Sequence, residues 1–275
     1  MAPFPPLMAE AEHLASTVLL GAHGRRKAGQ GDAFWQYRPA LPWDEARHID
    51  WRRSAKADGA FVKEREWQVA QSVLLWVDQG ASMRFASTDD IPTKLHRARL
   101  LAMAVSIMLL RSGERVGLAG DTLPPRNGRE QLNRLATRLT TDAPEDYAYP
   151  GTAGLLPQSR ALFISDFMGD LAPLELALTS AAERGIRGAI LQVLDPQEEE
   201  FPFHGRTVFQ SIGGTIAHET LHAGQLRDRY LTRLAQRKDA LTKLARATDF
   251  QITTHHTNDP ASAALLWLFN TLEHR

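Results

Sequence analysis

Short apolar runs alternate along this chain with longer segments of helical periodicity. Continuous apolar runs predict buried strands over residues 72–77, 115–119, 161–165, 188–194 and 250–254. Apolar residues that recur every three or four positions predict helices over residues 7–20, 93–111, 130–139, 171–184, 225–246 and 262–272. Because strands that alternate with helices form parallel sheets covered on both faces, the pattern predicts an α/β fold with a mostly parallel, doubly wound, Rossmann-like sheet.

Two segments interrupt this pattern. Residues 21–59 are rich in Gly, Trp and Arg and have no clean period. We therefore divide the chain into residues 1–59, an N-terminal helix and extension, and residues 60–275, the α/β domain, which begins with an alternating strand over residues 61–67. In the second segment, the turn at Gly213-Gly214 joins two short strands and predicts an inserted β-hairpin.

Composition narrows the class of protein. The chain has no cysteine, which excludes thiol catalysis, disulfides and thiolate metal sites. Its 32 Lys and Arg residues balance 32 Asp and Glu residues, so no overall charge attracts it to nucleic acid or to an anionic membrane. The longest apolar run, residues 100–110, is about half as long as a membrane-spanning helix, and the N-terminus has no signal-peptide pattern. We expect a cytoplasmic protein without a membrane span.

Three predicted strands end at an aspartate: Asp78, Asp166 and Asp195. Ligands of doubly wound sheets bind beyond the carboxyl ends of the strands, so we expect these carboxylates to meet at one edge of the sheet. They either form a binding site or accept hydrogen bonds from backbone N–H groups of the following turns.

The most unusual segment is a cluster of charged and aromatic residues between residues 38 and 56. Its members are Arg38, Trp43, Asp44, Arg47, Asp50, Trp51, Arg52, Arg53 and Lys56. Losing one member of a buried ion pair costs about 3–5 kcal/mol, so charges placed among large rings must be paired or must bind a partner. We expect either an internal latch or a docking surface, with Arg47 and Asp50 internal and Arg52, Arg53 and Lys56 available to a partner.

Together with residues 29–34, this cluster resembles the signature of the bacterial domain-of-unknown-function 58 family; residues 64–66, 165–166 and 200–205 support the likeness. The sequence departs from the family at residues 41–44, where a Gly-Asp-Asp turn is usual. The resemblance implies a von Willebrand factor A-like α/β domain. It also implies association with MoxR-type AAA+ ATPases and a part in the assembly, activation or metal loading of other proteins.

The von Willebrand factor A resemblance implies a metal site as well. Residues 78–82 are similar to the Asp-x-Ser-x-Ser motif, in which two hydroxyls bind a hard divalent ion with a Thr and an Asp from other loops. Asp78, Ser82 and Asp166 match by position, but Gly80 replaces the first hydroxyl. The candidates for the threonine are Thr122, Thr141 and Thr152. We expect weak binding of Mg²⁺ or none, with no other cofactor.

A second motif points to a different chemistry. Residues 218–222 read His-Glu-Thr-Leu-His, the pattern of zinc proteases, which requires both histidines on one helical face. Here His218 falls in the predicted hairpin, and neither Gln225 nor Asp228 continues the protease motif.

A basic row on the helix over residues 225–246 raises the possibility of a nucleic-acid binding surface. It consists of Arg229, Arg233 and Arg237, and it could track phosphates, but it lacks the interleaved aromatic residues of a single-strand binder. A solvated helix face is the alternative.

The family resemblance therefore implies a non-enzymatic, chaperone-like adaptor that binds a MoxR-type AAA+ ATPase and a client protein, and we expect no binding of nucleic acid. The alternatives are a metal-dependent hydrolase that uses the His-Glu-x-x-His motif and a local nucleic-acid binder.

Overall fold

A computed structural model describes residues 6–22, 34–56, 59–65, 70–210, 217–221 and 223–273. The chain divides into two units. The smaller unit is Arg25–Ala70, and the larger unit combines Met1–Gly24 with Gln71–Arg275. The N-terminal helix α1 (Pro6–Ala22) belongs to the larger unit rather than to the segment that follows it, because it packs against two helices of the α/β fold.

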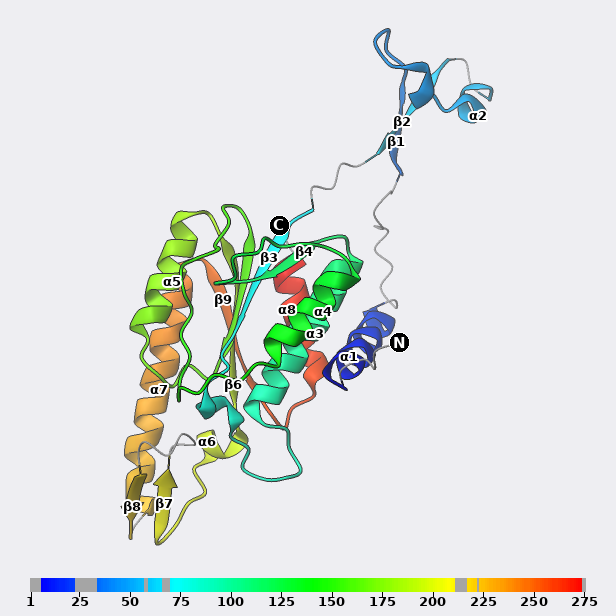
Figure 1. Ribbon diagram of the computed structural model, residues 1–275. Coiled ribbons are helices and arrows are strands. Elements are labelled where there is room, and N and C mark those ends of the chain that lie inside the picture. The colour runs from blue at the N-terminus through cyan, green and yellow to red at the C-terminus, as the bar shows by residue number, and fades with distance from the viewer. Residues whose placement is uncertain are drawn as a thin grey trace. The chain divides into compact units, whose positions relative to one another are not determined.

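The larger unit is built on a sheet of five parallel strands in the order β4-β3-β5-β6-β9 (Figure 1). The strands are β3 (Ser72–Val77), β4 (Arg115–Leu118), β5 (Arg160–Ser165), β6 (Arg187–Leu194) and β9 (Phe250–His256). The chain forms β3 in the interior of the sheet before it adds the edge strand β4, and it then crosses back to β5. This arrangement confirms the predicted mixed α/β fold with a parallel central sheet.

Helices cover both faces of this sheet, as Figure 1 shows. Side chains alternate along each strand, so Val73 and Leu75 enter one core while Leu74 enters the other. The first face is covered by α1, α3 (Lys94–Arg111), α4 (Arg129–Leu139) and α8 (Ala261–Glu273), and the second by α5 (Ala172–Glu183) and α7 (Ala223–Ala247).

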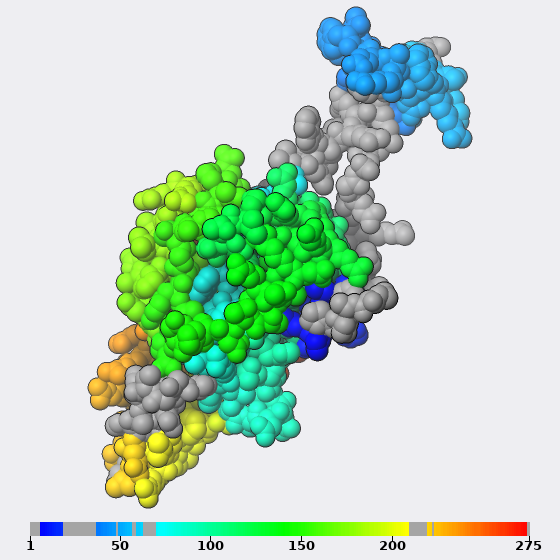
Figure 2. Space-filling model, viewed as in Figure 1, coloured from blue at the N-terminus to red at the C-terminus, as the bar shows by residue number. Residues whose placement is uncertain are grey.

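Helix α3 explains the longest apolar run of the sequence. It contacts the sheet on one side and α1, α4 and α8 on others, so nearly all of its side chains are buried. Within the described ranges, no helix combines the length and the apolar character needed to cross a membrane. In the space-filling view, the green atoms of residues that follow β3 cover most of that cyan strand (Figure 2).

Two short elements lie near the carboxyl ends of the strands, and a hairpin follows them. The short elements are the 3-10 helix η2 (Ala81–Arg84) and helix α6 (Pro196–Glu200). The predicted hairpin is confirmed: β7 (Thr207–Gln210) pairs antiparallel with β8 (Ala217–Thr220), with Phe209 opposite His218.

The smaller unit contains a second antiparallel pair, β1 (Phe34–Pro39) with β2 (Phe61–Arg65). Between them the chain forms η1 (Ala46–His48) and α2 (Trp51–Ser54). The strand expected over residues 61–67 therefore exists as β2, but it pairs with β1 instead of joining the parallel sheet. Strand β1 was not predicted.

Candidate functional site

The carboxyl ends of β3, β5 and β6 bring Asp78, Asp166 and Asp195 to one edge of the sheet. This confirms the expected meeting of the three strand ends, since the strands are parallel neighbours. All three side chains are buried. Asp195 caps α6 by accepting from the N–H of Gln197, and it also accepts from the N–H of Ser87.

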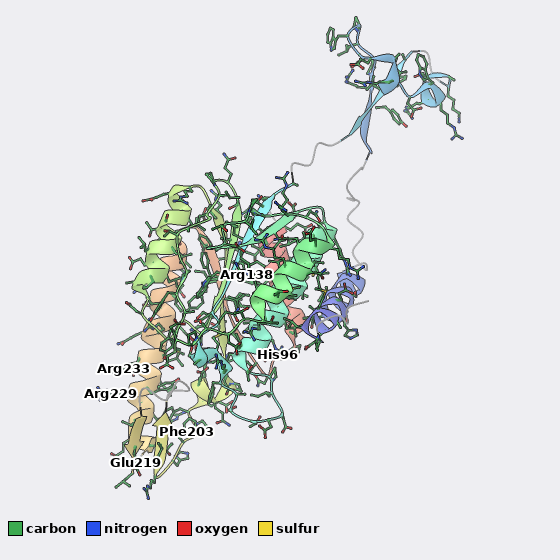
Figure 3. The ribbon with its side chains drawn as sticks, viewed as in Figure 1. His96, Arg138, Phe203, Glu219, Arg229 and Arg233 are labelled. Atoms are coloured by element: carbon green, nitrogen blue, oxygen red, sulfur yellow. The ribbon has the colours of Figure 1, made fainter. Side chains whose placement is uncertain are left out.

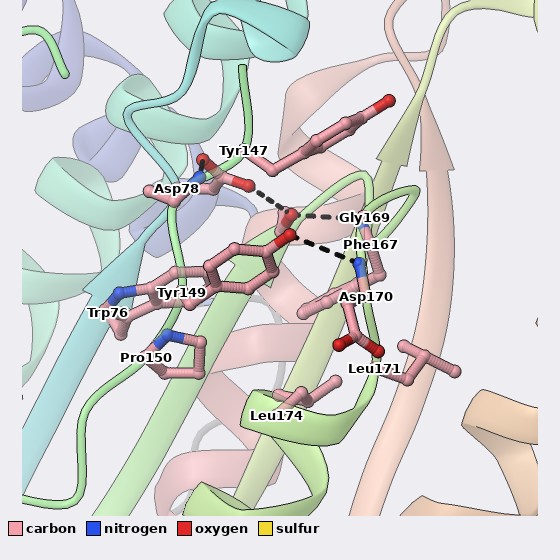
Figure 4. A pocket seen from close by; sticks show the side chains of 12 residues that line it. Trp76, Asp78, Tyr147, Tyr149, Pro150, Phe167, Gly169, Asp170, Leu171 and Leu174 are labelled. Atoms are coloured by element: carbon pink, nitrogen blue, oxygen red, sulfur yellow. Dashed lines mark hydrogen bonds between the residues drawn. The ribbon is translucent and has the colours of Figure 1, made fainter. Parts of the chain in front are cut away.

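The Asp78 carboxylate accepts hydrogen bonds from three groups of the protein. One carboxylate oxygen accepts from the N–H of Gly80 at 2.7 Å. The same oxygen accepts from the N–H of Ala148 at 3.1 Å, and the other accepts from the Ser165 hydroxyl at 2.7 Å (Figure 4). Burial raises the pKa of Asp78 above its ordinary value, although these hydrogen bonds oppose the shift. Asp78 thus joins the turn after β3, the loop at Ala148 and the end of β5 through backbone and hydroxyl donors, which is the alternative that the sequence left open.

Asp166 has a charged partner that the sequence did not indicate. The ammonium of Lys94 donates to Asp166 at 2.8 Å and to Glu198 at 2.7 Å. Only 2% of the Lys94 side chain and 1% of the Asp166 side chain are exposed. Burial lowers the pKa of Lys94, but the two carboxylates outweigh it and hold the pKa above its ordinary value. Burial raises the pKa of Glu198, and Lys94 offsets this only in part.

These residues do not fit the divalent ion that the motif implies. Asp166 and Glu198 already share the buried ammonium of Lys94, which a divalent ion would have to displace. At Gly80, a Cβ atom would lie 2.7 Å from the carbonyl oxygen of Asp146 and 2.9 Å from the nitrogen of Ala148, so no side-chain hydroxyl can be placed there.

The remaining expected ligands do not complete a metal site either. The Ser82 hydroxyl is buried and has no hydrogen-bond partner among the described residues. Thr141, which lies just after α4, donates to the carbonyl of Thr137 in that helix. In the described ranges, no group of three or more His, Asp or Glu side chains is arranged to hold a metal ion.

The space beside Asp78 is too small for a substrate. A hollow of about 10 Å³ is bordered by Trp76, Tyr147 and Tyr149 (Figure 4). A volume of this size holds about one water molecule. A larger groove, of about 540 Å³, is lined by Glu198, by Phe85 and by residues in and after α6 and in α7.

In the smaller unit, the charged cluster forms a specific framework. The guanidinium of Arg38 donates to both oxygens of Asp44, at 2.5 and 2.7 Å, and Asp44 also accepts from the N–H of Leu41. Such a forked ion pair fixes the turn geometrically. The expectation that Arg47 is internal is wrong, because its side chain is 72% exposed and pairs with Glu45.

Asp50 ties α2 to the β1–β2 hairpin. It caps α2 by accepting from the N–H of Arg53, and it accepts a second hydrogen bond from the Tyr37 hydroxyl. That hydrogen bond raises the pKa of Tyr37. The Arg53 guanidinium lies over the Tyr37 ring, 4.3 Å from its centre, so Arg53 belongs to the framework rather than to a free basic row.

Replacing Asp50 by alanine will destabilise the smaller unit by about 1 kcal/mol, because α2 loses its N-terminal cap. Amide hydrogen exchange in α2 and β2 measures this local stability. Arg47→Ala is the matched control and should leave exchange unchanged, since its exposed pair with Glu45 contributes little. Equal exchange in the two variants would contradict the capping role.

The same unit presents two large apolar side chains to solvent. Trp43 is 76% exposed and Trp51 is 62% exposed. Arg52 and Lys56, which follow Trp51 in the sequence, are also exposed.

The protease motif begins in a strand, because His218 and Glu219 belong to β8. The carboxylate of Glu219 accepts from Arg206 across the hairpin at 2.6 Å. His222 lies outside the described residues.

The three arginines of the basic row on α7 have different surroundings. Arg237 donates to the carbonyl of Met168, whereas Arg229 and Arg233 are exposed and line the groove beside Glu198.

Sequence reasoning missed Lys94 and Glu198. For Glu198 a signal existed, because Asp195 followed three residues later by Glu is the pattern of a capping box, and the structure contains that box. Lys94 stands in the first turn of α3, and nothing in its local sequence distinguishes it from a solvated lysine.

Comparisons with known proteins point to one family. A family model described as "Protein of unknown function DUF58" matches residues 36–240. The uncharacterised protein Rv1480 of Mycobacterium tuberculosis (strain ATCC 25618 / H37Rv) is 27% identical over 226 residues, which cover 77% of this chain and 70% of that protein. The uncharacterised protein Mb1516 of Mycobacterium bovis matches to the same extent.

Two solved structures are also similar. The conserved hypothetical protein BatB from Bacteroides thetaiotaomicron aligns with a TM-score of 0.43 and 18% identity, over 74% of this chain and 98% of that one. An aerotolerance-related membrane protein from Bacteroides fragilis aligns over the same shares with a TM-score of 0.41 and 16% identity.

Proposed function

The chain belongs to the DUF58 family, and we propose that it is a non-enzymatic, chaperone-like adaptor that links a MoxR-type AAA+ ATPase to a client protein in the cytoplasm. The larger unit is then a von Willebrand factor A-like scaffold without a bound metal ion. The smaller unit is the docking element for the ATPase.

The exposure of Trp43 and Trp51 carries this proposal. Tryptophan and arginine are enriched among the residues that contribute most to binding at protein interfaces. An exposed indole also leaves a large apolar surface in water, which a partner can bury. The Arg38–Asp44 pair and the Asp50 cap hold these two residues on a built framework, so their exposure is not a result of an irregular chain. Arg52 and Lys56 add positive charge for an acidic partner surface.

The sheet edge supports a scaffold more than an enzyme. Lys94, the Ser165 hydroxyl and backbone N–H groups engage the carboxylates of Asp78, Asp166 and Asp195, so among the described residues these three do not supply a free base. The protease alternative is not favoured, because Glu219 is paired with Arg206 and the motif begins in a strand. The nucleic-acid alternative is not favoured either, because only two arginines of the α7 row face the groove.

The proposal is tested by capture of a purified MoxR-type ATPase on the immobilised full chain. We expect the double variant Trp43→Ala/Trp51→Ala to weaken binding by about 30-fold or more, as loss of an interface centre worth at least 2 kcal/mol requires. Thermal unfolding should not change, because both side chains are exposed.

Leu176→Ala is the matched control, since Leu176 is a similarly exposed apolar side chain on the larger unit. It should bind as the wild type does. Charge reversal at Arg52 and Lys56 should slow association without affecting the fold. Undiminished capture by the tryptophan double variant would refute the docking role of the smaller unit.

A further inference from the structure

The groove between α6 and α7 has a wall of aromatic rings that pack against one another and are therefore preorganised for binding. Phe201 packs against Tyr230 with 4.9 Å between ring centres, and Phe203 meets Phe201 edge-on at 5.2 Å. Phe201 ends α6 with a backbone φ of +45°, a left-handed conformation that a bulky residue rarely adopts. The Phe201 side chain lines the groove. Rings held in this way lose little freedom when an apolar group binds against them.

Two arginines lie beside this wall. Arg229 and Arg233 are one turn apart on α7, both are exposed, and neither forms an ion pair with a described residue. Figure 3 shows them at the same end of α7 as Phe203. The neighbouring cations of the helix are engaged: Lys238 pairs with Glu199, and Lys243 pairs with Asp239.

The acidic residue of the groove does not cancel this positive charge. Glu198 lines the groove, but its carboxylate accepts from the buried ammonium of Lys94. The groove therefore combines an apolar wall with two guanidinium groups whose charge has no described partner. Each guanidinium can bind a carboxylate through two parallel hydrogen bonds.

We infer that this groove binds an acidic segment of a protein partner, with an apolar side chain against Phe201, Phe203 and Leu226 and carboxylates on Arg229 and Arg233. The inference goes beyond the proposed function, because it assigns a second binding surface, on the larger unit, and the chemistry of its occupant. The volume of about 540 Å³ has room for a few side chains.

Charge favours a protein segment over nucleic acid. A phosphate backbone needs a continuous track of cations, whereas the groove offers two arginines. A segment with one or two carboxylates matches these two arginines.

The test is selection of random heptapeptides displayed on phage against the immobilised full chain. We expect enrichment of sequences that combine Asp or Glu with Leu, Phe or Trp. A synthetic, fluorescein-labelled copy of a selected peptide should bind at least tenfold more weakly to Arg229→Glu/Arg233→Glu. Leu226→Ser should also weaken binding, which separates an apolar anchor from general charge attraction.

The matched control is Lys243→Glu/Arg246→Glu, which makes the same charge change on the same helix away from the groove. It should retain peptide binding. Failure of enrichment, enrichment without acidic residues, or equal loss in both double variants would overturn the inference. Binding of a labelled oligothymidylate that depends on Arg229 and Arg233 would instead assign the groove to nucleic acid.

The groove variant also separates this inference from the proposed function. Arg229→Glu/Arg233→Glu should capture the ATPase as the wild type does, because the docking tryptophans belong to the smaller unit. Loss of peptide binding with retained capture supports two independent surfaces. Loss of ATPase capture in the groove variant would contradict that independence.

Discussion

Replacing Lys94 by methionine will lower the free energy of unfolding by about 3–5 kcal/mol, the usual cost of leaving buried carboxylates without their cation. The methionine fills nearly the same volume, so the loss comes from charge rather than from a cavity. Asp166 is buried against the end of β5, and Glu198 is mostly buried, so water cannot replace the ammonium at both. Urea unfolding measures the change.

The pH dependence of this variant has a definite sign. In the wild type, the folded-state pKa of Lys94 is raised, so its contribution is complete below the ordinary lysine pKa and is lost only at high pH. Without Lys94, the pKa of Glu198 rises further, because only the hydrogen bond from the N–H of Asp195 then opposes the effect of burial. The folded variant therefore takes up a proton as pH falls. Its loss of unfolding free energy relative to the wild type should be smaller at pH 5 than at pH 8.

Lys243→Met provides the comparison, because Lys243 forms an exposed pair one helical turn from Asp239. That pair should contribute less than about 0.5 kcal/mol. Adding Asp166→Asn and Glu198→Gln to Lys94→Met should recover part of the lost stability, since no unpaired charge then remains. If Lys94→Met were as stable as Lys243→Met, Lys94 would not be the cation that stabilises the buried carboxylates of Asp166 and Glu198.

The position of the sheet edge could be predicted because its signals are local. Asp78 and Asp166 each follow a continuous apolar run, and the alternation of strands with helices implies parallel strands that end at one edge. His218 was likewise placed correctly in a hairpin, because two glycines precede a short strand. In each case, neighbouring residues along the chain determine the structure.

The partner of Asp166 could not be predicted, because it depends on packing between distant segments. Lys94 lies 72 positions before Asp166 and 104 positions before Glu198 along the chain. A lysine in the first turn of a helix is ordinarily solvated, and the acidic run Glu198–Glu200 has the composition of an exposed helix. Only the fold reveals that η2, α3 and α6 enclose these charges.

In the smaller unit, the residue types were informative but their pairing was not. Aspartates and arginines among tryptophans indicated a specified network, and Arg38 with Asp44 forms one. Whether Arg38 or Arg47 serves as the internal cation depends on the turn between β1 and η1, which has no periodicity to read. Strand β1 was missed for the same reason.

Gly80 offers the second large effect. Restoring the missing hydroxyl of the metal motif by Gly80→Ser should destabilise the protein by about 1–3 kcal/mol instead of creating a Mg²⁺ site. The new Cβ would meet the backbone at Asp146 and Ala148 and the Asp78 carboxylate, all within 3.0 Å. Backbone atoms cannot rotate away, so the loop that covers Asp78 must shift and its hydrogen bonds must lengthen.

Gly151→Ser separates this steric cost from the general effect of replacing a loop glycine, because a Cβ at Gly151 meets nothing within 4 Å. Its stability should stay within about 0.5 kcal/mol of the wild type. Unfolding with and without Mg²⁺ completes the test. If Mg²⁺ stabilised Gly80→Ser, the loop would have yielded and Lys94 would have released Asp166, and the sheet edge would then be a metal site that lacks one hydroxyl. We expect no such stabilisation, because the ammonium of Lys94 remains between the two carboxylates whichever residue stands at position 80.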